Sequence, residues 1–204
     1  MAERYLVTHS LLSAWQYLLK ENPYEDATTE SDPMGDFLRL LRREPTPTTE
    51  AMQNGIEFEN LVTDIIHSCG DRSNKWWDAA AQIARELTGA QLQVKVSKEI
   101  QVGSYTVVLY GRLDALKAGE ITDIKFSKGY ERGKYYDSTQ HPSYLELVQE
   151  ADRFTYIVSN GADVWHETYL REDATDIRTI ISRFFDWLHA NDLWALYEVH
   201  WSAK

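Results

Sequence analysis

The segment 109–128, LYGRLDALKAGEITDIKFSK, carries the residues of this chain whose types and spacing best suit catalysis. Asp114 and Asp123 stand nine positions apart, and Lys125 follows two positions after the second aspartate. In a strand, Asp123 and Lys125 share one face, roughly 6–7 Å apart at about 3.3 Å per residue. Carboxylates bind Mg²⁺ or Mn²⁺, and a nearby lysine can orient a water or offset charge on a phosphate. The segment therefore predicts a divalent-metal site that acts on phosphates.

The site depends on how the two strands of this segment pair. A three-residue turn places Asp114 on the face of Thr122, away from Asp123. A four-residue loop, or a bulge at Gly119, shifts the register and places Asp114 beside Asp123. Because a metal site requires the second register, we expect that one.

A third carboxylate comes from the segment 51–68, AMQNGIEFENLVTDIIHS, whose apolar residues fall in one helical arc. Glu59 lies at the edge of this arc, whereas Glu57 and Asp64 point away from it. Glu59 is thus the natural third oxygen ligand. The six histidines are scattered and show no metal-ligand pairing.

Helix periodicity and strand alternation place these residues in a mixed fold. The order is helices, three strands, a helix, two strands and a helix, which predicts an α/β (α+β) fold with a central mixed sheet of about five strands flanked by helices. Helices are expected over residues 8–20, 37–44, 51–68, 75–88 and 138–154, and strands over 92–116 (with a turn at Gly103–Ser104), 120–127 and 154–170 (with a turn at Asn160–Gly161). Residues 21–35 are expected to form a loop.

Length and composition favour a single globular domain. The chain has 204 residues, of which 43% are hydrophobic and 12% aromatic. We expect one domain over residues 1–204, with a helical N-terminal region (about 1–90) and a C-terminal amphipathic helix (about 173–190). No apolar run approaches 18 residues and the N-terminus lacks a basic segment before an apolar one, so we expect a cytoplasmic protein without a membrane partner.

The single cysteine, Cys69, excludes an intramolecular disulfide and any four-cysteine metal site within one chain. We therefore expect no iron–sulfur cluster.

The net charge of −11 argues against a non-specific nucleic-acid binder. Residues 117–134, however, carry five Lys or Arg against three Asp or Glu. Within them, Lys128, Arg132 and Lys134 form either a solvated loop or a phosphate-binding edge, with nearby tyrosines available to stack on bases.

The motifs GRLDAL, EITDIKFSK and STQHPSYLEL follow NGIEFENLV along the chain. In this order they resemble the PD-(D/E)XK nucleases, in the branch of RecB-like and lambda-exonuclease-type enzymes, over roughly residues 5–170. The resemblance implies a restriction-endonuclease-like core and a Mg²⁺- or Mn²⁺-dependent deoxyribonuclease. It further implies an exonuclease acting on the ends of linear DNA, in phage DNA processing, recombination or repair.

Positions carry over from the family one by one. The resemblance implies Glu59, Asp114 and Asp123 as metal ligands, together with the Ile124 carbonyl, and Lys125 as the catalytic lysine. Gln140 and Tyr144 match the Q-x-x-x-Y element, which contacts DNA or orders the site. Leu113 replaces the proline of the family name.

A second interpretation remains open, since a fold can persist after its site has decayed. The chain could be a catalytically inactive member of this fold that binds DNA ends or a protein. The resemblance also implies a homo-oligomer or a recombination protein as partner.

Overall fold

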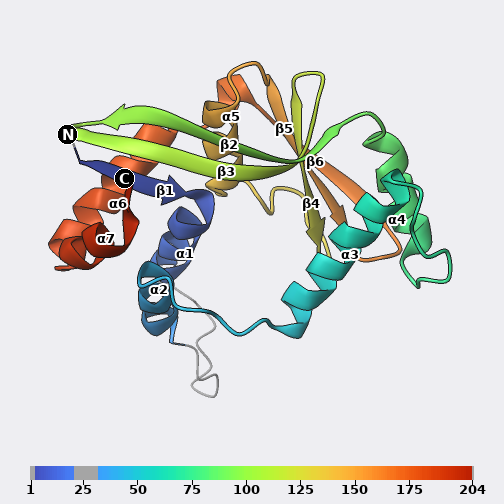
Figure 1. Ribbon diagram of the computed structural model, residues 1–204, viewed down its shortest axis with the longest axis horizontal. Coiled ribbons are helices and arrows are strands. Elements are labelled where there is room, and N and C mark those ends of the chain that lie inside the picture. The colour runs from blue at the N-terminus through green and yellow to red at the C-terminus, as the bar shows by residue number, and fades with distance from the viewer. Residues whose placement is uncertain (1–2, 21–31, 204) are drawn as a thin grey trace. The chain divides into compact units, whose positions relative to one another are not determined.

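The computed structural model describes residues 3–20 and 32–203. Most of the predicted loop 21–35 lies outside the described residues. Within them, the chain forms helices and strands in this order: β1 Arg4–Thr8, α1 His9–Leu19, α2 Pro33–Leu41, α3 Glu50–Ile66, α4 Trp77–Glu86, β2 Gln91–Val102, β3 Tyr105–Lys117, β4 Glu120–Phe126, α5 Gln140–Leu147, β5 Arg153–Ser159, β6 Val164–Leu170, the short 3₁₀ helix Arg171–Asp173, α6 Ile177–Ala190, α7 Trp194–Trp201 and β7 Ser202–Ala203 (Figure 1).

The expected α/β class is confirmed. Seven strands form one mixed sheet in the hydrogen-bonded order β6-β5-β4-β3-β1-β7, with β2 also pairing with β3. The sequence predicted about five strands. It missed β1 and β7, which have five and two residues and are too short for an alternation pattern to be read from the sequence.

The chain divides into two compact units. The first comprises residues Met1–Pro47, Ser97–Gly111 and Thr175–Lys204, and the second Thr48–Val96 and Arg112–Ala174. The strands β2 and β3 run through both units, so neither unit is continuous in sequence. Whether the chain folds as the expected single domain stays a prediction.

The first unit is built around β1 and the first half of β3, which pair in parallel from Arg4↔Thr106 to Thr8↔Tyr110. The helix α1 begins where the hydroxyl of Thr8 accepts a hydrogen bond of 3.3 Å from the Leu11 amide. The expected C-terminal amphipathic helix is α6, which buries Ile177, Ile181, Phe184, Phe185 and Leu188, whereas Ile180 is only half-buried.

The second unit holds the candidate site. Strand β4 pairs in parallel with β5, and β5 pairs in antiparallel with β6. Apolar side chains of α3 and α4 form one core cluster with Ala115 and Ile157, and side chains of α5 form another with Leu113, Phe154 and Tyr156. Since residues of β5 enter both clusters, the sheet of this unit is covered on both faces.

The turn between β3 and β4 sets the register of the two aspartates. Lys117 pairs with Glu120 across a two-residue turn, and Ala118 and Gly119 both adopt positive φ, 48° and 81°. Positive φ at both central positions is the requirement of the tight hairpin turn that matches strand twist. Continuing this antiparallel register places Asp114 opposite Asp123. Asp114 therefore lies beside Asp123 as expected, but the expected four-residue loop or bulge at Gly119 is wrong, because a two-residue turn gives the same facing of the two side chains.

Gly161 in the β5–β6 turn has φ +92°, and a Cβ at this position would lie 2.7 Å from Nε1 of Trp76. We predict that Gly161→Ala lowers the free energy of unfolding by about 1–3 kcal/mol more than Gly89→Ala. Gly89 is the matched control, because its φ is also positive (+82°) but nothing lies within 4 Å of its added Cβ. Urea denaturation of both variants measures the difference, and equal losses would contradict the role of Trp76.

Candidate functional site

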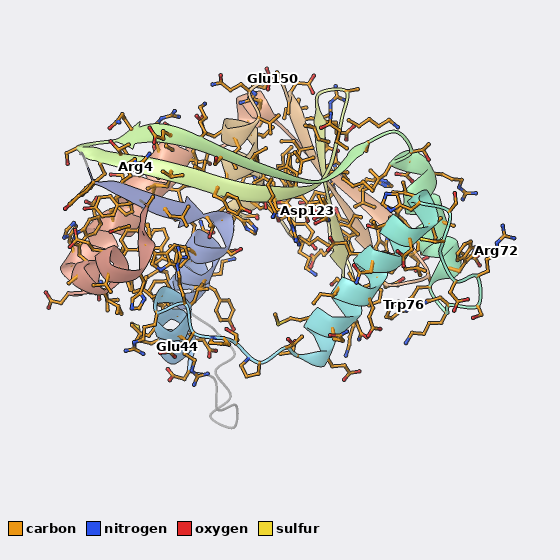
Figure 2. The ribbon with its side chains drawn as sticks, viewed as in Figure 1. Arg4, Glu44, Arg72, Trp76, Asp123 and Glu150 are labelled. Carbon is orange, nitrogen blue, oxygen red and sulfur yellow. The ribbon has the colours of Figure 1, made fainter. Side chains whose placement is uncertain are left out.

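Asp114 and Asp123 face each other across neighbouring strands of the second unit. The backbone N–H of Ile124 donates a hydrogen bond of 2.9 Å to Oδ2 of Asp114. Asp114 is half-buried, and Asp123 is only 4% exposed. Figure 2 labels Asp123 among the side chains of the protein. The hairpin register therefore brings together the two carboxylates that the sequence singled out.

The electrostatics of Asp114 reflect this crowding. Burial, followed by the charges of Asp123 and Glu59, raises the pKa of Asp114 to about 8, against the Ile124 amide and the Lys125 ammonium, which lower it. Two buried like charges disfavour ionisation of one of them. A cation between the carboxylates would relieve this cost.

Lys125 supplies the nearest positive charge. Its Nζ lies 2.7 Å from Oδ2 of Asp123, and its side chain is 32% exposed. Burial works to lower the pKa of Lys125, but the charges of Asp123, Asp114 and Glu59 outweigh it and the net pKa is raised. The lysine is therefore a stable ammonium that borders the carboxylate pair.

Gln140 and Tyr144 lie on α5 and are 5% and 3% exposed. The amide of Gln140 donates a short hydrogen bond to Oδ1 of Asp123, and the hydroxyl of Tyr144 donates one of 3.0 Å to the Arg112 carbonyl. Of the two roles predicted for this pair, DNA contact or ordering of the site, the geometry favours ordering.

Glu59 lies on α3, which packs against β4. Its Oε1 accepts a hydrogen bond of 2.6 Å from the side chain of Gln93, and its charge reaches Asp114 and Lys125. Sequence reasoning missed Gln93. A non-glycine residue at positive φ (53°) in a strand could not be foreseen from the side chain type.

The carboxylate oxygens expected to bind a metal meet only some of the requirements of a hard divalent cation. Oδ2 of Asp123 is buried and has no hydrogen-bond partner within residues 3–20 and 32–203, although it lies beside the ammonium of Lys125. Among these same residues, no group of three or more His, Cys, Asp or Glu side chains is gathered closely enough to hold a metal. The expected ligands Glu59, Asp114 and Asp123 are therefore not gathered into one metal-binding group, although the two aspartates face each other and the charge of Glu59 acts on Asp114.

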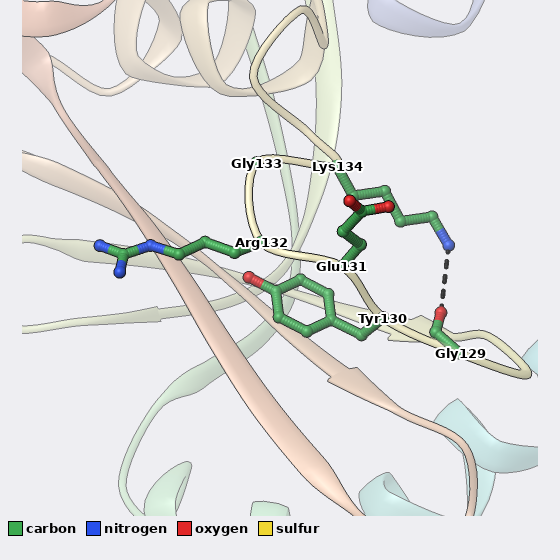
Figure 3. Close-up of a pocket in the computed structure, with 6 residues that line it drawn as sticks. All are labelled: Gly129, Tyr130, Glu131, Arg132, Gly133 and Lys134. Carbon is green, nitrogen blue, oxygen red and sulfur yellow. Dashed lines mark hydrogen bonds between the residues drawn. The ribbon is translucent and has the colours of Figure 1, made fainter.

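The predicted phosphate-binding residues lie on the loop that follows β4. Lys128, Arg132 and Lys134 are all exposed, and residues 129–134 line a hollow of about 600 Å³. Lys134 donates hydrogen bonds to Oγ of Ser127 (2.7 Å) and to the Gly129 carbonyl (3.4 Å). Figure 3 shows Lys134 extending away from the side of the loop on which Tyr130 and Arg132 extend. Lys134 thus stabilises the loop through these two hydrogen bonds.

A second buried acid, Glu167 on β6, anchors this loop and was not singled out in the sequence. It is 8% exposed and accepts hydrogen bonds from the Tyr130 hydroxyl (2.7 Å), the Gly133 amide (3.2 Å), the Tyr135 amide (3.1 Å) and the Tyr169 hydroxyl. Burial works to raise the pKa of Glu167, but these donors outweigh it and the net pKa is lowered. Glu167 therefore remains an anion that fixes the loop conformation.

The loop connects to the aspartate pair through stacked rings. The rings of Tyr135 and Tyr156 stack with centroids 4.3 Å apart, and Tyr156 pairs with Asp123 in the β4–β5 ladder. Burial and the charges of Asp123 and Glu167 raise the pKa of Tyr135 to about 12. The charges of both acids therefore act on the hydroxyl of Tyr135.

None of the helices formed by the described residues has the length and apolar character needed to cross a bilayer.

Comparison with known proteins adds information on the fold alone. No protein-family model matches the chain, and no curated protein is similar enough in sequence to match it. Among solved structures, the chain is similar to the crystal structure of SSO0001, with a TM-score of 0.56 and 15% sequence identity over 93% of this chain and 78% of that chain. At this identity, the likeness supports the α/β architecture and says nothing about activity.

We predict that Asp114→Asn stabilises the metal-free protein by about 0.5–2 kcal/mol, because it removes one of two crowded carboxylates while its amide oxygen can still accept from Ile124. Urea denaturation in EDTA measures this change. The exposed Asp173 provides the control, since Asp173→Asn should leave stability within about 0.5 kcal/mol. A destabilised Asp114→Asn protein would show that the carboxylate is adequately compensated without a cation.

Proposed function

We propose that this protein is a Mg²⁺- or Mn²⁺-dependent deoxyribonuclease that hydrolyses phosphodiester bonds. The observation that carries the proposal is the placement of Asp114 opposite Asp123, with Nζ of Lys125 2.7 Å from Asp123. Two carboxylates and a lysine on one hairpin are what metal-assisted phosphate hydrolysis requires. The preference for an exonuclease acting on linear DNA rests on the family resemblance of the motifs.

In this proposal the chain's own residues hold and order the reacting groups. Asp114, Asp123, Glu59 and the Ile124 carbonyl would hold the cation. A divalent cation bound there would polarise a phosphate as a Lewis acid and would lower the pKa of a nearby water.

The remaining polar groups act on the carboxylates and on the substrate. Gln140 fixes the orientation of Asp123 through its hydrogen bond, and the Ile124 amide does the same for Asp114. The ammonium of Lys125 can donate to a water or to a phosphate oxygen as negative charge builds on it.

We expect Lys125→Met to lower the rate of DNA cleavage in Mn²⁺ by on the order of 100-fold or more, because it removes the positive charge that lies 2.7 Å from Asp123. The assay follows end-labelled single-stranded and duplex DNA over time. Lys95→Ala, which removes an exposed lysine of β2, is the matched control and should cleave at close to the wild-type rate.

Circular dichroism should show that the Lys125→Met protein is folded. Wild-type cleavage by a folded Lys125→Met protein would remove this residue from the mechanism.

Binding of DNA should depend on salt through the exposed cations of the loop. The measured quantity is the slope of the logarithm of the DNA-binding constant against the logarithm of the salt concentration, in EDTA. We predict that Lys128→Ala and Arg132→Ala each reduce the magnitude of this slope by about 0.7–0.9, the value per phosphate contact. Lys134→Ala should have a smaller effect, since its ammonium already bonds to Ser127 and Gly129.

The exposed Lys95 of β2 controls for net charge, and Lys95→Ala should leave the slope unchanged. Slopes unaffected by both Lys128→Ala and Arg132→Ala would place the DNA elsewhere on the protein.

One observation favours a second candidate, a non-catalytic module that binds DNA ends or a protein. Lys125 already neutralises part of the Asp123 charge, and within the described ranges no three-residue metal group is assembled. Calorimetric titration with Mn²⁺ separates the two. Absence of binding at millimolar Mn²⁺ together with no cleavage would favour the module, whereas binding that is lost in Asp123→Asn would favour the enzyme.

A further inference from the structure

A second hollow, which we call the β6 hollow, lies between the loop and strand β6 of the second unit. It has a volume of about 330 Å³, within the range of pockets that take a small ligand. Six residues line it: Tyr130, Arg132, Trp165, His166, Glu167 and Thr168. None of them belongs to the aspartate pair or to its hydrogen-bond partners.

Two aromatic rings make up part of this lining. The rings of Tyr130 and Trp165 stack with centroids 5.7 Å apart and planes inclined by 27°. Both residues are only half-buried. Flat, partly exposed rings are the surfaces on which unpaired nucleobases stack.

The charge available in the β6 hollow is positive. Arg132 is exposed, and within the described part of the chain its guanidinium forms no hydrogen bond or ion pair. Its charge opposes the rise in the pKa of Tyr130, which places it close to that ring. Figure 3 shows Tyr130 and Arg132 extending from the loop in the same direction.

The acidic lining residue is already satisfied. Glu167 accepts four hydrogen bonds, two of them from backbone amides of the loop, so it holds the hollow in shape and offers little to a cationic ligand. His166 lies 2.7 Å from Glu86, which does not line the hollow. What remains for a ligand is an aromatic platform beside one unpaired guanidinium.

We propose that the β6 hollow binds one unpaired base of single-stranded DNA, which stacks on the Tyr130–Trp165 pair while Arg132 contacts an adjacent phosphate. The inference rests on the proposed function, and it adds a preference for single-stranded substrate. Duplex DNA fits this site poorly, because its bases are stacked on each other and their faces are covered. The loop is already fixed by Glu167, so little ordering would oppose binding.

The test measures binding of fluorescein-labelled dT12 and of a duplex of the same length by anisotropy, in EDTA so that nothing is cleaved. Trp165→Ala should weaken binding of dT12 by about 5- to 150-fold and binding of the duplex by less than about 2-fold. Tyr136→Ala is the matched control: Tyr136 is 74% exposed on the same loop but does not line the hollow, and its loss should leave dT12 binding unchanged.

Two further measurements keep the test decisive if Trp165→Ala is poorly folded. Trp165→Phe keeps an aromatic platform, and in it the quenching of tryptophan emission by dT12 should fall sharply relative to wild type. Replacing the thymines of dT12 by abasic sugars should weaken binding to the wild-type protein. The same replacement should weaken binding to the Trp165→Phe protein by a smaller factor. Equal quenching in both proteins, or equal effects of Trp165→Ala on dT12 and duplex, would overturn the proposal.

Failure of this inference can be told apart from failure of the proposed function. Lys125→Met tests cleavage and Trp165→Ala tests selective binding of dT12, and Lys125 does not line the hollow. Cleavage without selective dT12 binding would overturn the hollow's role alone, and selective dT12 binding without cleavage would overturn the nuclease alone.

Discussion

Asp123 is a carboxylate with 4% exposure on a strand whose faces are both covered by core side chains. A buried carboxylate is costly unless it is paired and hydrogen-bonded. Gln140 from α5 and Lys125 from the same strand provide those partners. Gln140 is the first residue of α5, and strand alternation places Lys125 on the same face of β4 as Asp123, so both partners of this carboxylate are set by the secondary structure around it.

Glu167 on β6 is a second buried carboxylate that must be paired or hydrogen-bonded. Its four donors come mostly from the loop between β4 and α5, so the buried acid determines the conformation of a long connection with little regular structure. The stacked rings of Tyr135 and Tyr156 lie between the two acids. The loop therefore contacts β6 through Glu167, and it contacts Tyr156, the strand partner of Asp123, through Tyr135.

The crowding of Asp114 against Asp123 stands apart from this pattern of satisfied acids. Its raised pKa means that the negative charge of the pair is incompletely compensated by the protein alone. Natural proteins retain such local cost where function requires it. Because this negative charge is incompletely compensated, metal-dependent activity is the first function to test. In the proposed enzyme, compensation comes from the cation.

The sequence by itself determined the α/β class, the approximate positions of the long helices and strands, and the residue types of the site, because periodicity and strand alternation are local properties. It placed a helix over residues 138–154, whereas α5 ends at Leu147 and β5 begins at Arg153. It also narrowed the register of Asp114 and Asp123 to two choices. Only the tertiary structure decided between them, through the two-residue turn at Ala118–Gly119. Likewise, the pairing of Gln93 with Glu59 and of Trp165 with Tyr130 joins residues more than 30 positions apart. Such contacts depend on strand order and on how α3 packs on the sheet, and no local pattern in the chain encodes them.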